Sequence, residues 1–245
     1  MVLAKVGHVR ILLANANSTE ALTEACAALA RLAASAGTLI ESWTNHEGPP
    51  AVDSMYGDYM AGRPLARALA LLSPPPDALV LAGFGNYGTA AVKEVFQAPV
   101  VSMAEAAMAI AVPLCHRFAI VTTAVRMIPY TEDFVQLAGF APRCAAVRAV
   151  ELPPLGALLE DGQGVAEALA RAVAALVADT RADLVILGGA RLSPYAAALR
   201  PRSPVPIIEP VACGVQMAEA LVRLGLAQSK AGKFAPPPRD LKEYE

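Results

Sequence analysis

The chain has 245 residues, 56% of them hydrophobic and 17% charged, so it can bury a large core in one domain or in two smaller ones. Its formal net charge is −2 and it has no basic run, which argues against nucleic acid or an anionic membrane as a partner. Three histidines and four widely spaced cysteines, without a Cys-x-x-Cys pair, argue against a metal site, and no apolar stretch predicts a transmembrane helix.

The chain opens on a strand pattern at residues 8–15 with no small-residue cleavage site before it, so we expect no signal peptide and a cytoplasmic protein. A helix follows, which Ser18 or Thr19 can cap and which Gly37 is expected to close. In the rest of the first half, strands are predicted at residues 37–45, 77–83 and 98–103. Helices are predicted at residues 89–96 and 104–114, and a loop that leads into a helix at residues 48–65.

At Arg117 the same plan starts again. Strands are predicted at residues 117–124, 145–152, 183–189 and 205–210, and helical segments at 130–140, 165–182, 193–200 and 212–225. Strands that alternate with helices indicate parallel sheets, and the nearly continuous apolar strands fit sheets that are covered on both faces. The last residues, 226–245, lose this periodicity and are expected to lie extended on the surface.

The two halves share a repeated strand end. Asp77 and Asp183 each precede an apolar run, and a glycine follows six positions later, at Gly83 and Gly189. A proline that opens the next strand follows after 16 positions in the first half (Pro99) and 17 in the second (Pro206). We interpret this as a duplication, with halves at 1–115 and 116–225, although αβ chains can also look repetitive without one. Facing halves would place their strand ends around one cleft, where ligands of α/β sheets bind.

Five short segments of the chain resemble the aspartate/glutamate racemase superfamily, and specifically its hydantoin racemase branch. They are "ILLANANST", "PVVSMAEAAM", "FAIVTTA", "VPIIEPV" and "SKAGKFAPPP", with Ala16 and Glu209 where the branch usually has proline and aspartate. The resemblance covers nearly the whole chain. It implies two flavodoxin-like parallel-sheet halves related by pseudo-two-fold symmetry, a site in the cleft between them, no cofactor and no metal. It also implies a small carbonyl or carboxylate ligand.

The resemblance raises a problem of chemistry. The family removes and returns a proton next to a carbonyl with two cysteines, one in an Ala-Cys-Phe motif and one in a Leu-Gly-Cys-Ala motif. This sequence has Gly83 and Gly189 at these two positions. Glycine cannot act as a general acid or base, but its backbone N–H groups can form a nest for an oxyanion. We therefore expect a cradle that binds the ligand through Asn17, Ser18, Gly83, Phe84, Gly85, Thr122, Thr123, Gly189 and Ala190.

Other residues are weaker candidates for the missing groups. Tyr87 can overhang the cleft, but a loop aromatic is the commoner outcome, and Glu209 can point to the cleft or bind its own loop backbone. The remaining candidates are more easily read as packing or solvated residues: Cys213, the neighbours Cys115 and His116, and the loop residues His46 and Asp58. The "GFGNYG" segment lacks the acidic partner of a dinucleotide-binding fingerprint.

Three interpretations of function remain open. The first is a cofactor-independent enzyme that acts next to the carbonyl of a hydantoin-, amino-acid- or carboxylate-like compound. It is either a racemase whose bases come from residues other than the two cysteines, or an enzyme of a different reaction. The same cradle would also serve decarboxylation, elimination or hydrolysis. The second is a ligand-binding protein without catalysis. The third is a racemase in which both cysteines were deliberately replaced by glycine. The apolar helices indicate a homo-oligomer.

Overall fold

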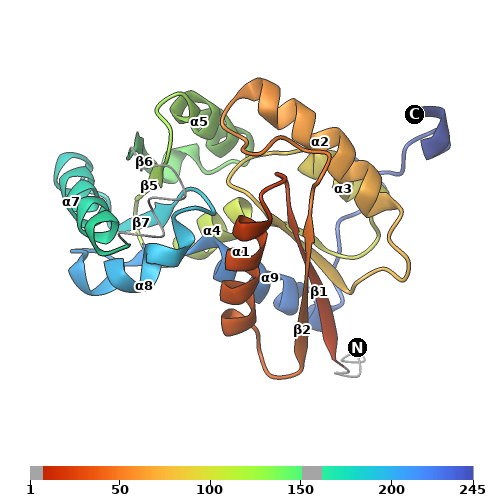
Figure 1. Cartoon of the computed structure of the whole chain (residues 1–245), viewed down its shortest axis with the longest axis horizontal. Coiled ribbons are helices and arrows are strands. Elements are labelled where there is room, and N and C mark those ends of the chain that lie inside the picture. Colours follow the sequence, from red (N-terminus) through yellow and green to blue (C-terminus); the bar gives the residue numbers. More distant parts are fainter. Residues whose placement is uncertain (1–7, 151–161, 245) are drawn as a thin grey trace.

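The computed structural model describes residues 8–150 and 162–244, which form two four-stranded parallel sheets with helices on both faces (Figure 1). The first sheet contains, in spatial order, β2 (Thr38–Thr44), β1 (Val9–Asn15), β3 (Ala78–Ala82) and β4 (Val100–Ser102). The second contains β6 (Cys144–Ala149), β5 (Phe118–Thr122), β7 (Leu184–Leu187) and β8 (Ile207–Ile208). The spatial order is the same in both halves, so the predicted fold class is confirmed.

The apolar runs become the central strands of each sheet. Every residue of β3, β5 and β7 is buried, as expected for strands that helices cover on both faces. The edge strand β2 instead alternates between exposed and partly buried residues over most of its length. The parallel register pairs Asn15 with Ala82 in the first sheet, and Val121 with Leu187 in the second, so neighbouring strands in each sheet end side by side.

The helices surround these sheets. Those of the first half are α1 (Glu20–Ala33), α2 (Met55–Ala70), α3 (Thr89–Val95) and α4 (Met103–Ala111). Those of the second are α5 (Met127–Leu137), α7 (Gly162–Thr180), α8 (Ala196–Leu199) and α9 (Pro210–Leu224), with short 3-10 turns at Ala141–Arg143, Ser193–Tyr195 and Arg200–Arg202. The last two residues of the strand predicted at 145–152 lie outside the described residues, as do residues 1–7, on which the signal-peptide prediction rests in part.

The first helix differs from its prediction at both ends. It ends at Ala33, because the N–H of Ala34 makes the last helical hydrogen bond, and Gly37 (φ +87°) instead turns the chain into β2. Thr19 is the N-cap residue, but its side chain does not cap the helix. Its hydroxyl donates to the carbonyl of Pro50 at 2.7 Å, which ties the start of α1 to the loop before α2.

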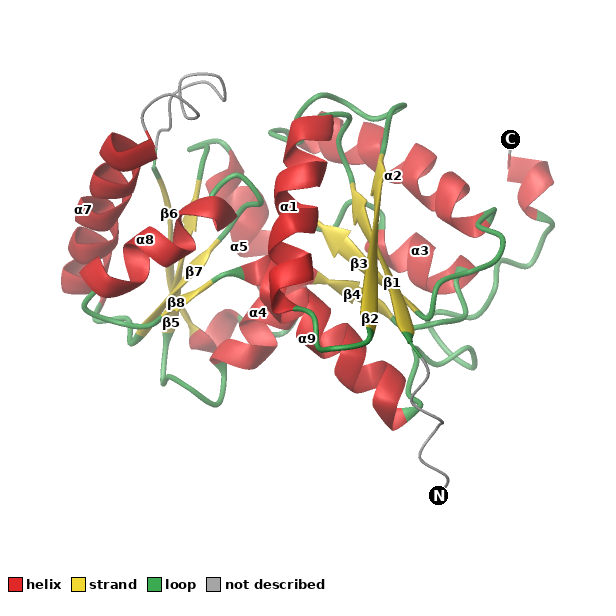
Figure 2. Cartoon of the chain, turned by 60° about the horizontal axis from the view of Figure 1, so that its bottom comes forward, coloured by secondary structure: helices red, strands yellow, loops and turns green. Residues whose placement is uncertain are grey.

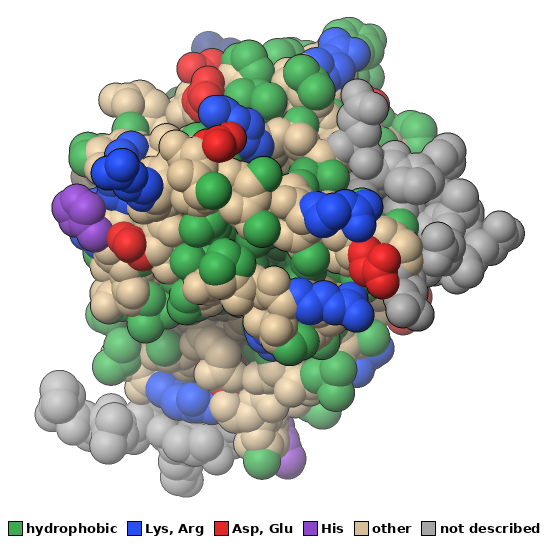
Figure 3. Space-filling view, turned by 90° about the vertical axis from the view of Figure 1, so that its left-hand side faces the viewer, with side chains coloured by type: hydrophobic (Ala, Val, Ile, Leu, Met, Phe, Trp, Pro, Cys, Tyr) green, Lys and Arg blue, Asp and Glu red, His purple; other side chains and the backbone are tan. Residues whose placement is uncertain are grey.

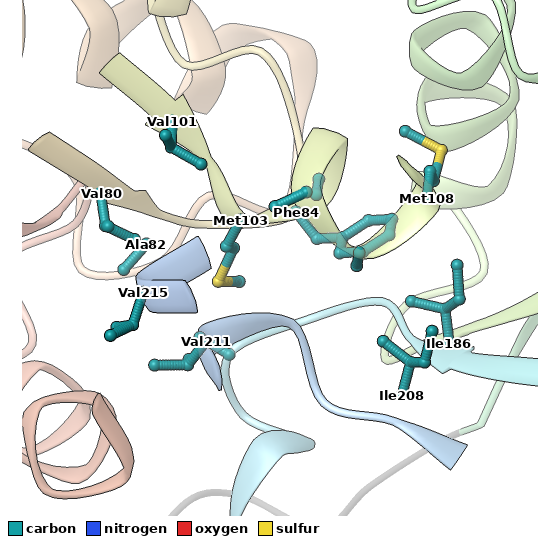
Figure 4. Close-up of a cluster of buried hydrophobic side chains, with 14 of the residues drawn as sticks. Val80, Ala82, Phe84, Val101, Met103, Met108, Ile186, Ile208, Val211 and Val215 are labelled. Carbon is teal, nitrogen blue, oxygen red and sulfur yellow. The ribbon is translucent and has the colours of Figure 1, made fainter. Parts of the chain in front are cut away.

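The last helix of the second half crosses to the first sheet. α9 packs on β1, β3 and β4 and against α1 and α4, while α4 also contacts β7 of the second sheet (Figure 2). The contact of α9 with β3 is close: a Cβ at Gly214 would lie 2.8 Å from Cγ1 of Val80. One core cluster therefore draws side chains from both halves, among them Val80, Phe84, Met103, Ile186 and Val211 (Figure 4). The sequence boundary at residue 115 remains a prediction, since packing is shared across it.

The C-terminal tail, predicted as extended, is held on the first half and ends in a 3-10 turn at Leu241–Tyr244. The side-chain amide of Gln228 donates to the carbonyls of Phe96 and Ala98, and its oxygen accepts from the N–H of Val100. Lys230 donates to three carbonyls at the end of α3, those of Lys93, Glu94 and Phe96. The tail thus satisfies carbonyl groups that a helix C-terminus leaves open.

Within residues 8–150 and 162–244, none of the helices combines the length and the apolar character needed to cross a membrane. On the face shown in Figure 3, basic and acidic side chains are scattered among apolar ones rather than gathered into a patch of one sign. This distribution agrees with the small net charge of the chain.

Candidate functional site

The turns after four strands meet at one cavity between the halves. The cavity has a volume of about 330 Å³, and Asn17, Gly83, Thr122 and Gly189 all line it. They follow or end β1, β3, β5 and β7, so each sheet contributes two neighbouring strand ends. This is the carboxyl edge at which parallel α/β sheets bind ligands.

Most residues proposed from the sequence reach this cavity. Phe84, Thr123 and Ala190 line it as well, whereas Ser18 and Gly85 do not. The backbone N–H of Ser18 donates to the carbonyl of Pro49 at 3.0 Å, and so holds the loop before α2. That loop contributes the cavity residues Pro50, Ala51, Val52 and Asp53, which the sequence did not single out.

The end of β1 is organised by a buried asparagine. The side-chain amide of Asn15 donates to Oδ1 of Asn17 and to the hydroxyl of Thr23 at 3.0 and 2.9 Å. Oδ1 of Asn17 also accepts the N–H of Thr19 at 3.0 Å. Because this oxygen is already used, the group that Asn17 can offer to a ligand is its side-chain NH₂. Asn15 sets the orientation of Asn17, and only its position at the strand end hinted at that role.

The turn after β7 differs from the expected nest of N–H groups. The N–H of Gly188 donates to the carbonyl of Val121 at 2.6 Å, and the N–H of Gly189 donates to the carbonyl of Leu187 at 2.9 Å. Both donors are satisfied within the protein because the turn closes tightly on itself and on β5. Polar contacts for a ligand therefore have to come from other cavity residues, such as Asn17, Thr122 and Thr123.

The two glycines lie in different surroundings. Neither has a positive φ angle, so the backbone at both positions suits any L residue. A Cβ at Gly189 would meet nothing within 4 Å. A Cβ at Gly83 would lie 2.1 Å from Cε2 of Tyr87, because the phenol ring covers that glycine. Although the sequence pattern is repeated, the space in front of Gly189 is open and the space in front of Gly83 is filled by Tyr87.

Tyr87 belongs to a hydrogen-bonded group that spans both halves. Its backbone N–H donates to Oδ1 of Asp58 at 2.8 Å, and the N–H of Asn86 donates to the hydroxyl of Tyr130 at 2.7 Å. The side chains of Tyr130 and Asp58 also lie close enough to affect each other's pKa. Burial raises the pKa of Asp58, Tyr87 and Tyr130 above their ordinary values. Both phenols therefore stay protonated near neutral pH.

The charged side chains at the cavity are Asp53 and Arg191, one from each half. The loop residue His46, a candidate to fold over the cleft, is 67% exposed and faces Glu20 at 3.9 Å. Asp58 does reach the vicinity of the cavity, but as the acceptor for Tyr87 rather than as a lining residue.

Glu209 and the two cysteine candidates have structural roles outside the cavity. Glu209 caps α9: its two carboxylate oxygens accept the N–H groups of Val211 and Ala212 at 2.7 and 2.8 Å. Burial, followed by the charge of Glu209, raises the pKa of Cys213 to about 12. The thiol of Cys115 donates a hydrogen bond to the carbonyl of Ala111. In the part of the chain that the structure describes, no His, Cys, Asp and Glu side chains gather in a group that could hold a metal.

Comparison with known proteins decides the family. The model of the Asp/Glu/hydantoin racemase family matches residues 11–218. The chain belongs to this family. It is 34% identical over 232 residues to a hydantoin racemase from Paenarthrobacter aurescens, covering 93% of this chain and 97% of the relative. A second hydantoin racemase, from Rhizobium meliloti, is 33% identical over 231 residues, or 94% and 95% of the two chains.

Solved structures of family members have the same architecture. An allantoin racemase from Pseudomonas fluorescens superimposes with a TM-score of 0.90 at 35% identity, over 95% of this chain and 98% of that one. One from Klebsiella pneumoniae gives 0.88 at 34% identity, over 95% of each chain. A glutamate racemase from Bacillus anthracis, at 18% identity and a TM-score of 0.60, shares the fold over 91% and 85% of the two chains. The resemblance stated from the sequence is confirmed.

Proposed function

We propose that the protein binds a small hydantoin-ring or amino-acid-like compound in the cavity between its halves. It acts next to the carbonyl of that compound without a cofactor, by a reaction other than proton exchange between two thiols. The hydantoin and allantoin racemase relatives support the ring as the first class to test. The cavity volume suits a compound of this size, and its amide and hydroxyl groups suit the N–H and carbonyl edges of such a ring.

The observation that carries this proposal is the set of groups that line the cavity. Among the described residues that line it there is no cysteine, histidine, lysine or glutamate, and the ionisable side chains there are Asp53, Tyr87 and Arg191. We propose that Gly83 and Gly189 occupy the two positions at which the family has its catalytic cysteines. General acid and base groups typically each contribute about 10²–10⁴-fold to a rate, so proton exchange at the ligand carbon is expected to be very slow.

The experiment has two parts. Calorimetric titration with 5-substituted hydantoins, allantoin, aspartate and glutamate tests which class binds, with Gly189→Trp as a variant that fills the open side. Proton NMR in D₂O then follows loss of the signal from the hydrogen next to the carbonyl. We expect hydantoin-ring compounds to bind, Gly189→Trp to abolish binding, and deuterium exchange to stay near the uncatalysed rate. Rapid exchange by the natural chain would contradict the proposal and identify a replacement base.

Product analysis separates the alternatives. Loss of CO₂, elimination or ring opening would identify a decarboxylase, lyase or hydrolase that uses the same cavity. Tight binding with an unchanged ligand would identify a binding protein. Cytoplasmic location and assembly into a homo-oligomer remain parts of this proposal, and size measurement in solution tests the second.

A further inference from the structure

The two glycine sides of the cavity differ in free space, because the side chain of Tyr87 fills one of them. On the β3 side, the ring of Tyr87 occupies the space in front of Gly83, with Cε2 and Cδ2 at 2.1 and 2.6 Å from the position of a Cβ there. On the β7 side, the space in front of Gly189 is open to at least 4 Å. Both glycines and Tyr87 line the same cavity, so a bound molecule meets an aromatic wall on one side and free volume on the other.

The Tyr87 ring is not free to move aside. Tyr87 has a φ angle of +37°, which is unfavourable for a bulky residue and is maintained only where the surroundings fix it. Its N–H is held by Asp58 at 2.8 Å, and the residue as a whole is 7% exposed. The next residue, Gly88, packs directly on Gly62 of α2, where a Cβ would lie 3.1 Å from the Gly62 Cα.

The phenol ring of Tyr130 packs next to the ring of Tyr87. A Cβ at Gly85 would lie 2.5 Å from the hydroxyl oxygen of Tyr130 and 2.9 Å from Cζ of Tyr87, so both rings meet at this glycine. Tyr130 belongs to α5 of the second half and is itself fixed by Asn86 and Asp58. The ring of Tyr87 is therefore clamped from both halves of the protein.

We propose that Tyr87 is the specificity-determining residue that makes the site select one enantiomer of a 5-substituted hydantoin, by forcing the larger C5 substituent to lie over Gly189. This inference rests on the proposed function. The hydantoin ring is planar and its C5 substituents project from its two faces. With the ring edge held by the polar groups of the cavity, one enantiomer directs the larger group to the open side, and the other directs it against Tyr87.

The probe is 5-methyl-5-phenylhydantoin, which has no hydrogen at C5 and therefore cannot be racemised during the measurement. Titration of each pure enantiomer into the natural chain is expected to show a preference of about tenfold or more, the range in which a pocket rejects extra carbon atoms. Tyr87→Gly removes the ring and also suits the positive φ, so this variant is expected to fold and to bind both enantiomers within about threefold. Tyr87→Phe, the matched control, keeps the ring and should keep the preference.

Equal binding of the two enantiomers by the natural chain, or an unchanged preference in Tyr87→Gly, would overturn the inference while leaving the proposed ligand class intact. A stability measurement tests the one-sided geometry without a ligand. Gly83→Ala should lower the denaturation midpoint, Gly189→Ala should not, and Gly83→Ala should become harmless in the Tyr87→Gly background. Equal tolerance at both glycines would overturn the inference too. If this coupling is present but neither enantiomer binds, the proposed hydantoin class fails, and the stereochemical assignment fails with it.

Discussion

The carboxylate oxygen Oδ2 of Asp77 accepts a hydrogen bond from the backbone N–H of Arg10 at 2.7 Å. Asp183 makes the equivalent contact in the second half, where its Oδ2 accepts the N–H groups of His116 and Arg117 at 3.0 Å each. In each half, the aspartate that precedes the third strand thus fixes the start of the first. The repeated Asp and Gly of the sequence mark the two ends of this strand pair: the aspartate aligns its start, and the glycine lies at the cavity end.

The folded state should lose stability in acid when the carboxylate of Asp183 becomes protonated. The two N–H donors hold its pKa below the ordinary value of about 3.9, so its stabilising effect is complete above that value and is lost as the pH falls through the folded-state pKa. Asp183→Asn should therefore flatten the melting-temperature profile at pH values below the ordinary pKa of an aspartate, about 3.9. Asp179→Asn, an exposed change on α7, is the control. A profile unchanged by Asp183→Asn would contradict this prediction.

Proton exchange should be restorable, but only if the filled side of the cavity is cleared. Gly189→Cys should be nearly neutral for stability, since its side chain enters open space. Gly83→Cys alone should cost roughly 1–3 kcal/mol because it collides with Tyr87. Combining both cysteines with Tyr87→Gly is expected to give measurable exchange of the C5 proton of a 5-monosubstituted hydantoin in D₂O. Each two-substitution subset serves as a control and should exchange far more slowly.

A folded triple variant that binds the hydantoin but exchanges no proton would mean that the cavity holds the ligand in a pose unsuited to proton transfer. The decarboxylase, lyase and hydrolase alternatives would then be the functions to test next.

Asn17 should contribute to ligand affinity through its side-chain NH₂. Asn17→Ala removes this donor and also the acceptor of the turn, so it should weaken binding by roughly 1–3 kcal/mol and lower stability as well. Asn17→Asp keeps the acceptor for the N–H of Thr19 and replaces the NH₂ donor with a charged carboxylate oxygen. We expect Asn17→Asp to bind weakly while melting close to the unsubstituted chain. Full affinity in Asn17→Asp would show that Asn17 only shapes the turn.

The tail should stabilise the first half through Lys230. Lys230→Met removes a charged donor from three carbonyls at the end of α3, and a loss of roughly 1–3 kcal/mol in the free energy of unfolding is expected. Lys242→Met, also in the tail, is the matched control and should change little. Chemical denaturation measures both, and similar midpoints for the two variants would argue that the tail contact adds nothing.

The sequence predicted the strands, the parallel sheets and the four strand-end turns that line the cavity, because these depend on local periodicity and on where parallel strands end. It could not predict that Tyr87 is buried over Gly83, because a positive φ at a tyrosine follows from packing by Asp58 and Tyr130, distant in the chain. The satisfied N–H groups at Gly188 and Gly189 were missed for a similar reason. Whether a turn closes on itself or opens to a ligand depends on its exact backbone path.

The crossing of α4 and α9 means that neither half is a removable part. Cutting the chain near residue 115 would leave the first sheet without α9 and expose the apolar faces of Val80 and Met103. We expect fragments 1–115 and 116–245 to be poorly structured alone and to regain structure when they are mixed, because each completes the core of the other. The same interlock resists rotation of the halves, so a ligand should enter past the loop at residues 49–53 rather than through a hinge.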